Sequence, residues 1–240
     1  MRFIDHHAAS CARRIASARQ RIGAFAKIGW WRPPTFASMR CLPARASDGP
    51  SLLRRQKMRR VIVSTYMTLD GRVDDIRDWA LRFNDDEAVN YHAALLETSD
   101  GLLMGRKTYE IFAAIWPAMA GKIPYVDKMN RMAKYVASTT LEELTWENSH
   151  RIKGDVAQAV AMLKQQPGQD LVVYGCHDLM HSLLRHDLID EYRILIHPVL
   201  LGTGRSFLDD GAKRVDLRLV HTAVLTSGVV ICTYQPARKG

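Results

Sequence analysis

The sequence Gly105-Arg106-Lys107-Thr108 combines a glycine, two cations and a hydroxyl where an apolar run gives way to a helical pattern. Unpaired backbone N–H groups at the start of a helix attract anions. The helix dipole favours acidic side chains there, so two cations at this point oppose the dipole and indicate a bound anion. We therefore predict a site for a phosphate monoester, with a solvated helix start as the alternative.

Two further junctions carry groups that suit a nucleotide. Gly175 and Cys176 follow one apolar run, and Ser138 and Thr139 follow a shorter one. A glycine between a strand and a helix lets the backbone approach a diphosphate closely. Ligands of open α/β sheets collect at the carboxyl ends of the strands. We therefore expect these junctions and the one at Gly105 to face a single crevice.

Asp70 is the candidate catalytic residue, in the sequence Thr68-Leu69-Asp70-Gly71 directly after the first predicted strand. Its carboxylate could hydrogen-bond to substrate or ribose, or it could be a turn aspartate before glycine. The acids at 85–87 begin a predicted helix, and we interpret them as helix-capping residues. The proton for a reduction could also come from water.

His177 and His181 stand four residues apart, the spacing of two zinc ligands on one helix face. The sequence shows no third ligand beyond His186. We interpret the pair as partly exposed helix histidines and expect no metal site.

The elements that carry these residues alternate between strand and helix until the last third of the chain. Strands are predicted at 60–67, 101–104, 134–138, 171–174 and 192–199, and helices at 84–96, with Asn84 as the cap, 106–115, 127–132, 155–164 and up to about 185. Strands at 215–226 and 229–234 flank Ser227-Gly228 as a hairpin. This order predicts an α/β fold with a mainly parallel central sheet, helices on both faces and an antiparallel C-terminal hairpin.

The positive charge of the chain is concentrated in residues 1–57, which carry +10, whereas residues 58–240 carry −1. We predict that 1–57 form a basic, disordered extension and that the working domain begins at Met58. A transit peptide and a basic nucleic-acid arm are the alternatives. The nearly neutral remainder gives no basis for nucleic-acid binding, and no apolar run is long enough to cross a membrane. The scattered cysteines fit a reducing compartment, so we expect a cytoplasmic protein.

Four segments together carry a family resemblance: 64–71, 104–110, Val173-Tyr174-Gly175 and 190–205. They resemble the C-terminal reductase domain of the bifunctional deaminase-reductase of riboflavin biosynthesis. They are more similar still to the stand-alone bacterial members of that dihydrofolate-reductase-like superfamily. The resemblance covers nearly all of 58–240 and none of 1–57.

The resemblance implies a homodimeric reductase that uses NADPH and binds a small-molecule substrate. The positions it assigns to the cofactor are Gly105, Arg106, Lys107 and Thr108 for the 2′-phosphate, Ser138 and Thr139 for the adenosine side, and Gly175 and Cys176 for the diphosphate. The positions it assigns to the nicotinamide and substrate are Thr68, Leu69, Asp70 and Gly71.

The reaction of the family reduces a ribosyl carbonyl of a pyrimidine intermediate to a ribityl alcohol. The leading prediction is therefore an NADPH-dependent reductase resembling 5-amino-6-(5-phosphoribosylamino)uracil reductase. One alternative is a reductase of a pterin or of another small carbonyl or imine. Another is a non-catalytic nucleotide-binding protein of the same fold, which Cys176-His177 would favour because the family has a second small residue there.

Overall fold

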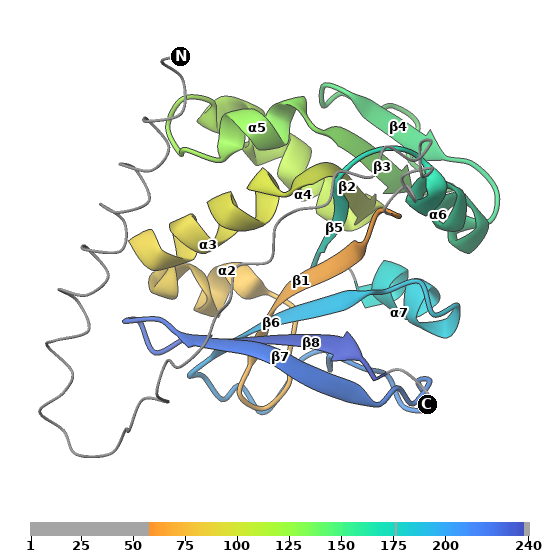
Figure 1. Cartoon of the computed structure of the whole chain (residues 1–240). Coiled ribbons are helices and arrows are strands. Elements are labelled where there is room, and N and C mark those ends of the chain that lie inside the picture. The colour runs from red at the N-terminus through yellow and green to blue at the C-terminus, as the bar shows by residue number, and fades with distance from the viewer. Residues whose placement is uncertain (1–57, 176, 238–240) are drawn as a thin grey trace, which may run out of the picture. The chain divides into compact units, whose positions relative to one another are not determined.

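The computed structural model describes residues 58–175 and 177–237, which form an eight-stranded sheet with helices packed on it (Figure 1). The predictions for residues 1–57 and for Cys176 lie outside the described residues. The strands are β1 (Val61–Thr68), β2 (Ser99–Gly105), β3 (Ala133–Ala137), β4 (Ser149–Ile152), β5 (Asp170–Tyr174), β6 (Glu191–His197), β7 (Leu217–Val224) and β8 (Val230–Pro236). The helices are α2 (Ile76–Trp79), α3 (Asp86–Glu97), α4 (Arg106–Ile115), α5 (Val126–Arg131), α6 (Val156–Gln165) and α7 (His177–Arg185), with 3-10 turns η1 (Leu81–Phe83) and η2 (Pro117–Met119).

The strand order across the sheet is β4-β3-β2-β5-β1-β6-β8-β7. The six strands from β4 to β6 pair in parallel, while β8 runs antiparallel to both β6 and β7. Strand β1 lies centrally, with Val63 opposite Val173 on one side and Tyr192 on the other. The predicted mainly parallel sheet with an antiparallel C-terminal hairpin is confirmed.

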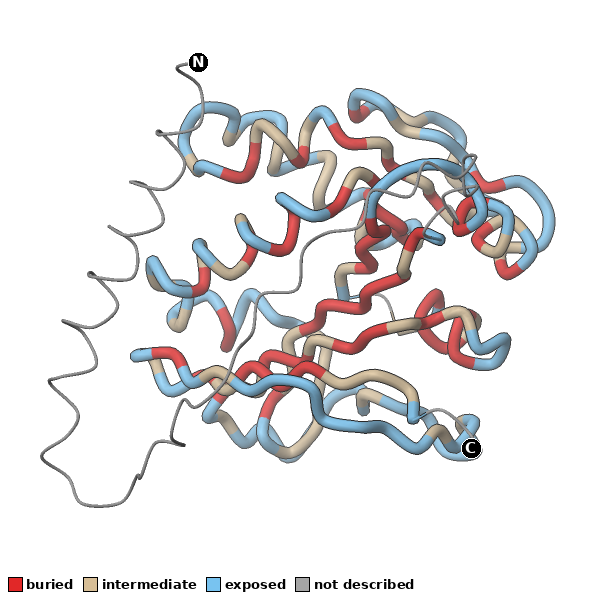
Figure 2. The backbone as a smooth tube through the Cα atoms, in the orientation of Figure 1, coloured by how far each residue is buried: buried red, intermediate tan, exposed pale blue. Residues whose placement is uncertain are grey.

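The central strands are buried along most of their length (Figure 2), and their alternating side chains pack into two separate cores. Val61 and Val63 pack with side chains of α6 and α7 on one face, whereas Ile62 packs with α3, α4 and α5 on the other. Successive residues of a strand point to opposite faces, so the buried run of β1 serves both cores. The prediction of helices on both faces is also confirmed.

The helix expected to begin at Asn84 starts one residue later. Asp85 is the N-cap of α3, and its side chain accepts a hydrogen bond from the backbone N–H of Ala88 at 2.9 Å. Both residue types favour this position, so local preference alone does not choose between neighbours. The loop predicted before this helix also contains the short helix α2, from which the buried Trp79 donates to the carbonyl of Asp74.

Strand β4 is an element that the sequence pattern does not predict. Its residues, Ser149–Ile152, are mostly polar and half-exposed at the edge of the sheet, so they lack a strand-like apolar alternation. Pairing with β3 defines the strand, with Val136 opposite Arg151. No helix within the described part of the chain is long and apolar enough to span a membrane.

Candidate active site

Five parallel strands have their carboxyl ends on the same side of the sheet, as their pairing shows. This side is called the carboxyl edge. Thr68 at the end of β1 is opposite His197 at the end of β6, and Gly105 at the end of β2 is opposite Ala137 at the end of β3. Tyr174 ends β5, which lies between β1 and β2. The described residues predicted to bind cofactor and substrate follow these strand ends, so the structure brings their loops to one edge. Their individual roles stay predictions.

The first turn of α4 carries the two cations of the predicted phosphate site. Arg106 begins the helix directly after Gly105, and the first turn contains no acidic residue. The guanidinium of Arg106 forms an exposed ion pair with Glu110 at 3.0 Å, while Lys107 is exposed. Buried Tyr109 anchors the helix, because its hydroxyl accepts the backbone N–H of Trp146 at 2.9 Å. An anion could compete for Arg106, since an exposed ion pair contributes little stability.

The serine after β3 shapes its own turn. The hydroxyl oxygen of Ser138 accepts the backbone N–H groups of Thr140 at 3.2 Å and Leu141 at 2.9 Å. Thr139 is exposed at the tip of this turn. The structure therefore gives Ser138 a local role in holding the turn that presents Thr139.

Gly175 links β5 to α7 in a left-handed conformation, with a φ of +47°. Side chains are strained there, so glycine is favoured at this position. Its N–H donates to the carbonyl of Ser64 at 3.3 Å, which fixes the turn against β1. A methyl group at Gly175 would meet no atom within 4 Å, so the space beside this backbone is open.

The carboxylate of Asp70 joins two loops that are far apart in sequence. It accepts hydrogen bonds from the hydroxyl of Thr68 at 2.6 Å and from the backbone N–H groups of Gly202 at 2.8 Å and Leu201 at 3.2 Å. These hydrogen bonds, led by that from Thr68, hold the pKa of Asp70 well below its usual range. Leu69 beside it is 64% exposed. Asp70 is thus an ionised acceptor already engaged by its own protein.

The same pair of loops is held together at further points. The carboxylate of Asp74 accepts the backbone N–H of Arg205 at 2.9 Å, and the carbonyl of Gly71 accepts that of Phe207 at 2.9 Å. Gly204 has a φ of +106°, and a Cβ atom there would lie 2.6 Å from Asp74. The loop after β1 and the loop after β6 therefore form one fixed rim beside the strand ends.

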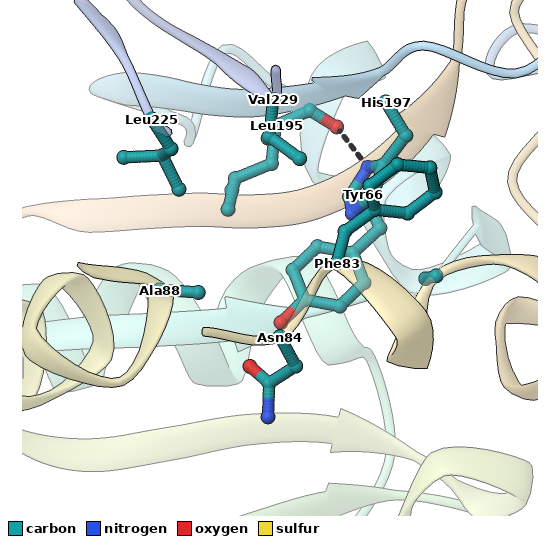
Figure 3. A pocket seen from close by; sticks show the side chains of 9 residues that line it. Tyr66, Phe83, Asn84, Ala88, Leu195, His197, Leu225 and Val229 are labelled. Carbon is teal, nitrogen blue, oxygen red and sulfur yellow. Dashed lines mark hydrogen bonds between the residues drawn. The ribbon is translucent and has the colours of Figure 1, made fainter. Parts of the chain in front are cut away.

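A small pocket opens beside the ends of β1 and β6 (Figure 3). Its lining residues are Tyr66, Ala80, Phe83, Asn84, Ala88, Leu195, His197, Leu225 and Val229. The ring of His197 lies 4.9 Å from that of Tyr66 and 5.6 Å from that of Phe83, measured between centroids. Nδ1 of His197 lies 3.0 Å from the carbonyl oxygen of Leu195, which can only accept, so Nδ1 carries a hydrogen. Burial lowers the pKa of His197, which leaves the pocket without a charged side chain at neutral pH.

A buried polar cluster beneath the pocket is the part of the site that the sequence patterns do not predict. The hydroxyl of Tyr66 lies 2.7 Å from Nε2 of His92, and Nδ1 of His92 lies 3.3 Å from the hydroxyl of Tyr174. Burial lowers the pKa of His92 to about 4, so the ring is neutral at neutral pH. A neutral imidazole has one N–H, so one tyrosine donates to the ring and the other accepts from it. His92 follows buried Ala88 by one helical turn, and this spacing could have placed it facing the sheet.

Comparison with known proteins places this architecture in a family. The sequence matches the RibD C-terminal domain model over residues 59–231. It is 31% identical over 186 residues to the uncharacterized protein YyaP of Bacillus subtilis (strain 168), covering 74% of this chain and 95% of YyaP. It is 28% identical over 167 residues to YwjB of the same organism, covering 68% of this chain and 91% of YwjB.

Solved structures agree with the sequence comparison. A putative riboflavin biosynthesis protein from Shewanella sp. PV-4 superposes with a TM-score of 0.61 at 26% identity, covering 75% of this chain and 99% of that one. A deaminase/5-amino-6-(5-phosphoribosylamino)uracil reductase from Thermotoga maritima has a TM-score of 0.54 at 14% identity, and covers 75% of this chain and 57% of that one. These likenesses confirm the predicted dihydrofolate-reductase-like fold. With the match over most of its length, the chain belongs to the RibD C-terminal domain family.

Proposed function

We propose that the chain is an NADPH-dependent reductase of a small carbonyl or imine substrate. One observation carries the proposal: α4 begins at the carboxyl edge of the sheet with Arg106 and Lys107 in a first turn that lacks an acid. Two cations at that position oppose the helix dipole, and a bound phosphate would relieve this. Membership of the RibD C-terminal domain family supports a reductase.

The described residues fit NADPH in three places. Arg106 and Lys107 would bind the 2′-phosphate, and the exposed Thr139 would lie on the adenosine side. The open space beside Gly175 would admit the diphosphate close to the backbone. When bound, NADPH supplies the hydride, and the protein holds the substrate.

Reduction of a carbonyl needs a proton at the new hydroxyl, and Tyr66 is well placed to hold one. Its ring lines the pocket and its hydroxyl meets His92. Burial raises the pKa of Tyr66, so its hydroxyl keeps its hydrogen and would donate a hydrogen bond to the substrate, while water would supply the proton itself. Asp70 is a weaker candidate for a proton donor because it is ionised and already accepts three hydrogen bonds. We infer that Asp70 positions the rim, and that Tyr66 meets the substrate.

The leading substrate is 5-amino-6-(5-phosphoribosylamino)uracil, the compound after which the Thermotoga maritima reductase is named. The base would lie against the mouth of the aromatic pocket, because the pocket itself has room for little more than a water molecule. Arg82 could meet the phosphate at the rim, since its guanidinium lies 4.9 Å from the centroid of the Phe83 ring. The uncharged lining also favours a second candidate, an unphosphorylated pterin.

The first test is nucleotide selectivity of the full chain. We expect NADPH to bind more tightly than NADH by fluorescence titration. Arg106→Ala should weaken NADPH binding by roughly 10-fold or more, because a charge-assisted hydrogen bond is lost, and leave NADH unchanged. Arg131→Ala is the control, since this exposed arginine ends α5 just before the amino end of β3, away from the carboxyl ends of the strands. Equal affinities for the two nucleotides in the native chain would contradict the cofactor assignment.

The second test is turnover, followed by the oxidation of NADPH. Reduction of the phosphoribosylaminouracil but not of dihydropterin would support the leading substrate, and Arg82→Ala should then raise its KM. The opposite preference would support the pterin candidate. Tight NADPH binding with no turnover of either compound would favour a non-catalytic nucleotide-binding protein.

A further inference from the structure

The first turns of α7 and the loop after β6 gather three side chains that ligate metals. His177 and His181 lie one helical turn apart, with ring centroids separated by 4.0 Å. Asp209 from the loop faces both rings: its carboxylate oxygens lie 3.3 Å from Nε2 of His177 and 3.0 Å from Nδ1 of His181. The ligand atoms of the three residues lie within 4.8 Å of one another. The structure therefore supplies the third ligand that the sequence did not reveal.

These separations match those of a small tetrahedral site. Zinc binds nitrogen and oxygen ligands at about 2.0–2.1 Å, which places neighbouring ligand atoms of a tetrahedron about 3.3 Å apart. The distances of 3.3 and 3.0 Å are near that value but run to different oxygens of the Asp209 carboxylate, and the three ligand atoms taken one per residue lie within 4.8 Å. A small adjustment of the two rings would complete the geometry.

The ring of His181 is oriented as metal-binding histidines usually are. Nε2 of His181 lies 3.2 Å from the carbonyl oxygen of Phe207, which can only accept, so Nε2 carries a hydrogen. In a neutral ring Nδ1 is then a bare acceptor, and it faces the carboxylate of Asp209 at 3.0 Å. Two acceptors this close need a proton or a metal ion between them. An N–H bonded to a backbone carbonyl is also how metal-binding histidines are usually oriented.

His177 provides an independent indication. Its side chain is only 6% exposed, and both ring nitrogens are buried without a hydrogen-bond partner among the described residues. Carboxylate oxygens of Asp178 and Asp209 lie near it, at 3.5 and 3.3 Å, outside good hydrogen-bond geometry. Buried polar groups are rarely left unsatisfied. One divalent ion between the two rings and Asp209 would give both histidines a partner at once.

The loop that carries Asp209 is held in place by other contacts. Phe207 donates its N–H to the carbonyl of Gly71, and Arg205 pairs with Asp178 on α7 at 2.6 Å. Asp209 itself is 58% exposed, so one side of the cluster is open to solvent. The site therefore offers three fixed protein ligands and an outer position for water.

We propose that His177, His181 and Asp209 bind one zinc ion, which joins the start of α7 to the loop after β6. Two imidazoles and one carboxylate suit zinc, whereas calcium and magnesium prefer oxygen ligands. The cluster begins two residues after Gly175, beside the position proposed for the diphosphate, but none of its three ligands is proposed to bind NADPH. Zinc affinity is therefore measured without nucleotide, so that its loss and the failure of the reductase proposal are distinguishable.

Zinc affinity of the metal-stripped full chain, measured by competition with a chromophoric chelator, tests the site. Compared with the native chain, Asp209→Asn and His181→Gln should each weaken the tightest zinc site by at least about 10-fold. Cobalt should give the intense visible bands of tetrahedral coordination in the native chain and lose them in both variants. His186→Gln is the matched control, because this histidine follows the same helix and lies outside the cluster.

Other metal-binding side chains in the chain do not confuse the comparison. His6, His7 and Cys11 are present in every variant, so only the difference from the native chain reports on this cluster. Asp209→Asn alters a mostly exposed side chain, and an unchanged thermal transition of the metal-free protein would show that it folds. Equal zinc stoichiometry and affinity in the native chain and in an Asp209→Asn/His181→Gln double variant would overturn the proposal.

Discussion

At the scale of single residues, His92 couples the site to pH. Its ring lies among Tyr66, Tyr91, Tyr125 and Tyr174, none of which is charged near neutral pH. Burial lowers its pKa to about 4, while the unfolded chain would titrate near 6.5. The folded protein therefore keeps His92 neutral at pH values at which the unfolded chain would already protonate it.

We predict that the free energy of unfolding falls as the pH drops from about 6.5 to about 4, because only the unfolded chain then takes up the His92 proton. Above about pH 6.5 neither state binds the proton and no stability is lost. The loss on going down to about pH 4 is about 3 kcal/mol at most. His92→Gln, which keeps a donor and an acceptor, should show a smaller loss between about pH 7 and about pH 5 in urea unfolding.

His221→Gln is the control for this measurement, because His221 is exposed on β7. It should keep the acid sensitivity of the native chain. The buried His197 is present in all three proteins and cancels in the comparison. An unchanged pH dependence in His92→Gln would show that another group causes it.

Asp70→Asn should loosen the rim, because an amide cannot accept all three of the hydrogen bonds that the carboxylate accepts. We expect faster amide hydrogen exchange at Leu201 and Gly202. Asp75→Asn is the control, since Asp75 is exposed and asparagine tolerates its left-handed backbone. Unchanged exchange with lost turnover would instead support the predicted catalytic role of Asp70.

At the scale of elements, the two cations at the start of α4 oppose the helix dipole, and the proposed function makes them the ligands of a phosphate. Lys107→Gln should leave the free energy of unfolding unchanged or raise it by about 0.3 kcal/mol, because it removes a cation from the positive end of the helix dipole. The same change should weaken NADPH binding and spare NADH. Urea unfolding and nucleotide titration of one variant measure both effects. A clear loss of stability would mean that Lys107 serves the fold rather than a ligand.

At the scale of the whole molecule, β7 forms one edge of the sheet and is exposed along most of its length (Figure 2). Several of its exposed side chains are apolar. Leu217, Leu219 and Val224 are 42%, 51% and 70% exposed. They pair with Pro236, Tyr234 and Val230, which alternate along β8, so all three point to the same face. This strip is the candidate interface for the homodimer that the family resemblance implies.

We predict that the native chain is a dimer by light scattering and that Leu219→Lys/Val224→Lys is a monomer. Two lysines on this strip would place charges within the apolar surface that a second chain would cover, where an unpaired charge is costly to bury. His221→Lys is the control, because His221 pairs with Thr233, whose side chain points to the opposite face of the sheet from the strip. A dimeric double variant would place the interface elsewhere, and a monomeric native chain would contradict the homodimer prediction.

The sequence by itself determined the order of the main elements, the two-faced sheet and the junctions at its carboxyl edge. These features depend on local preferences: β-branched runs such as Val61-Ile62-Val63 favour buried strands, and the cations before Tyr109 mark an unusual helix start. Because these preferences are local, they miss elements that form only through contacts with distant residues. Ser149–Ile152 has no strand pattern and becomes β4 only through its pairing with β3.

Only the tertiary structure decided which distant side chains meet. Asp70 binds backbone groups about 130 positions away, Tyr66 and Tyr174 meet across His92, and Asp209 joins two histidines on α7. Each contact depends on strand register and on the path of a loop, and neither leaves a periodic trace in the sequence. The chemistry-bearing residues could therefore be named from the sequence in part, while their partners had to come from the fold.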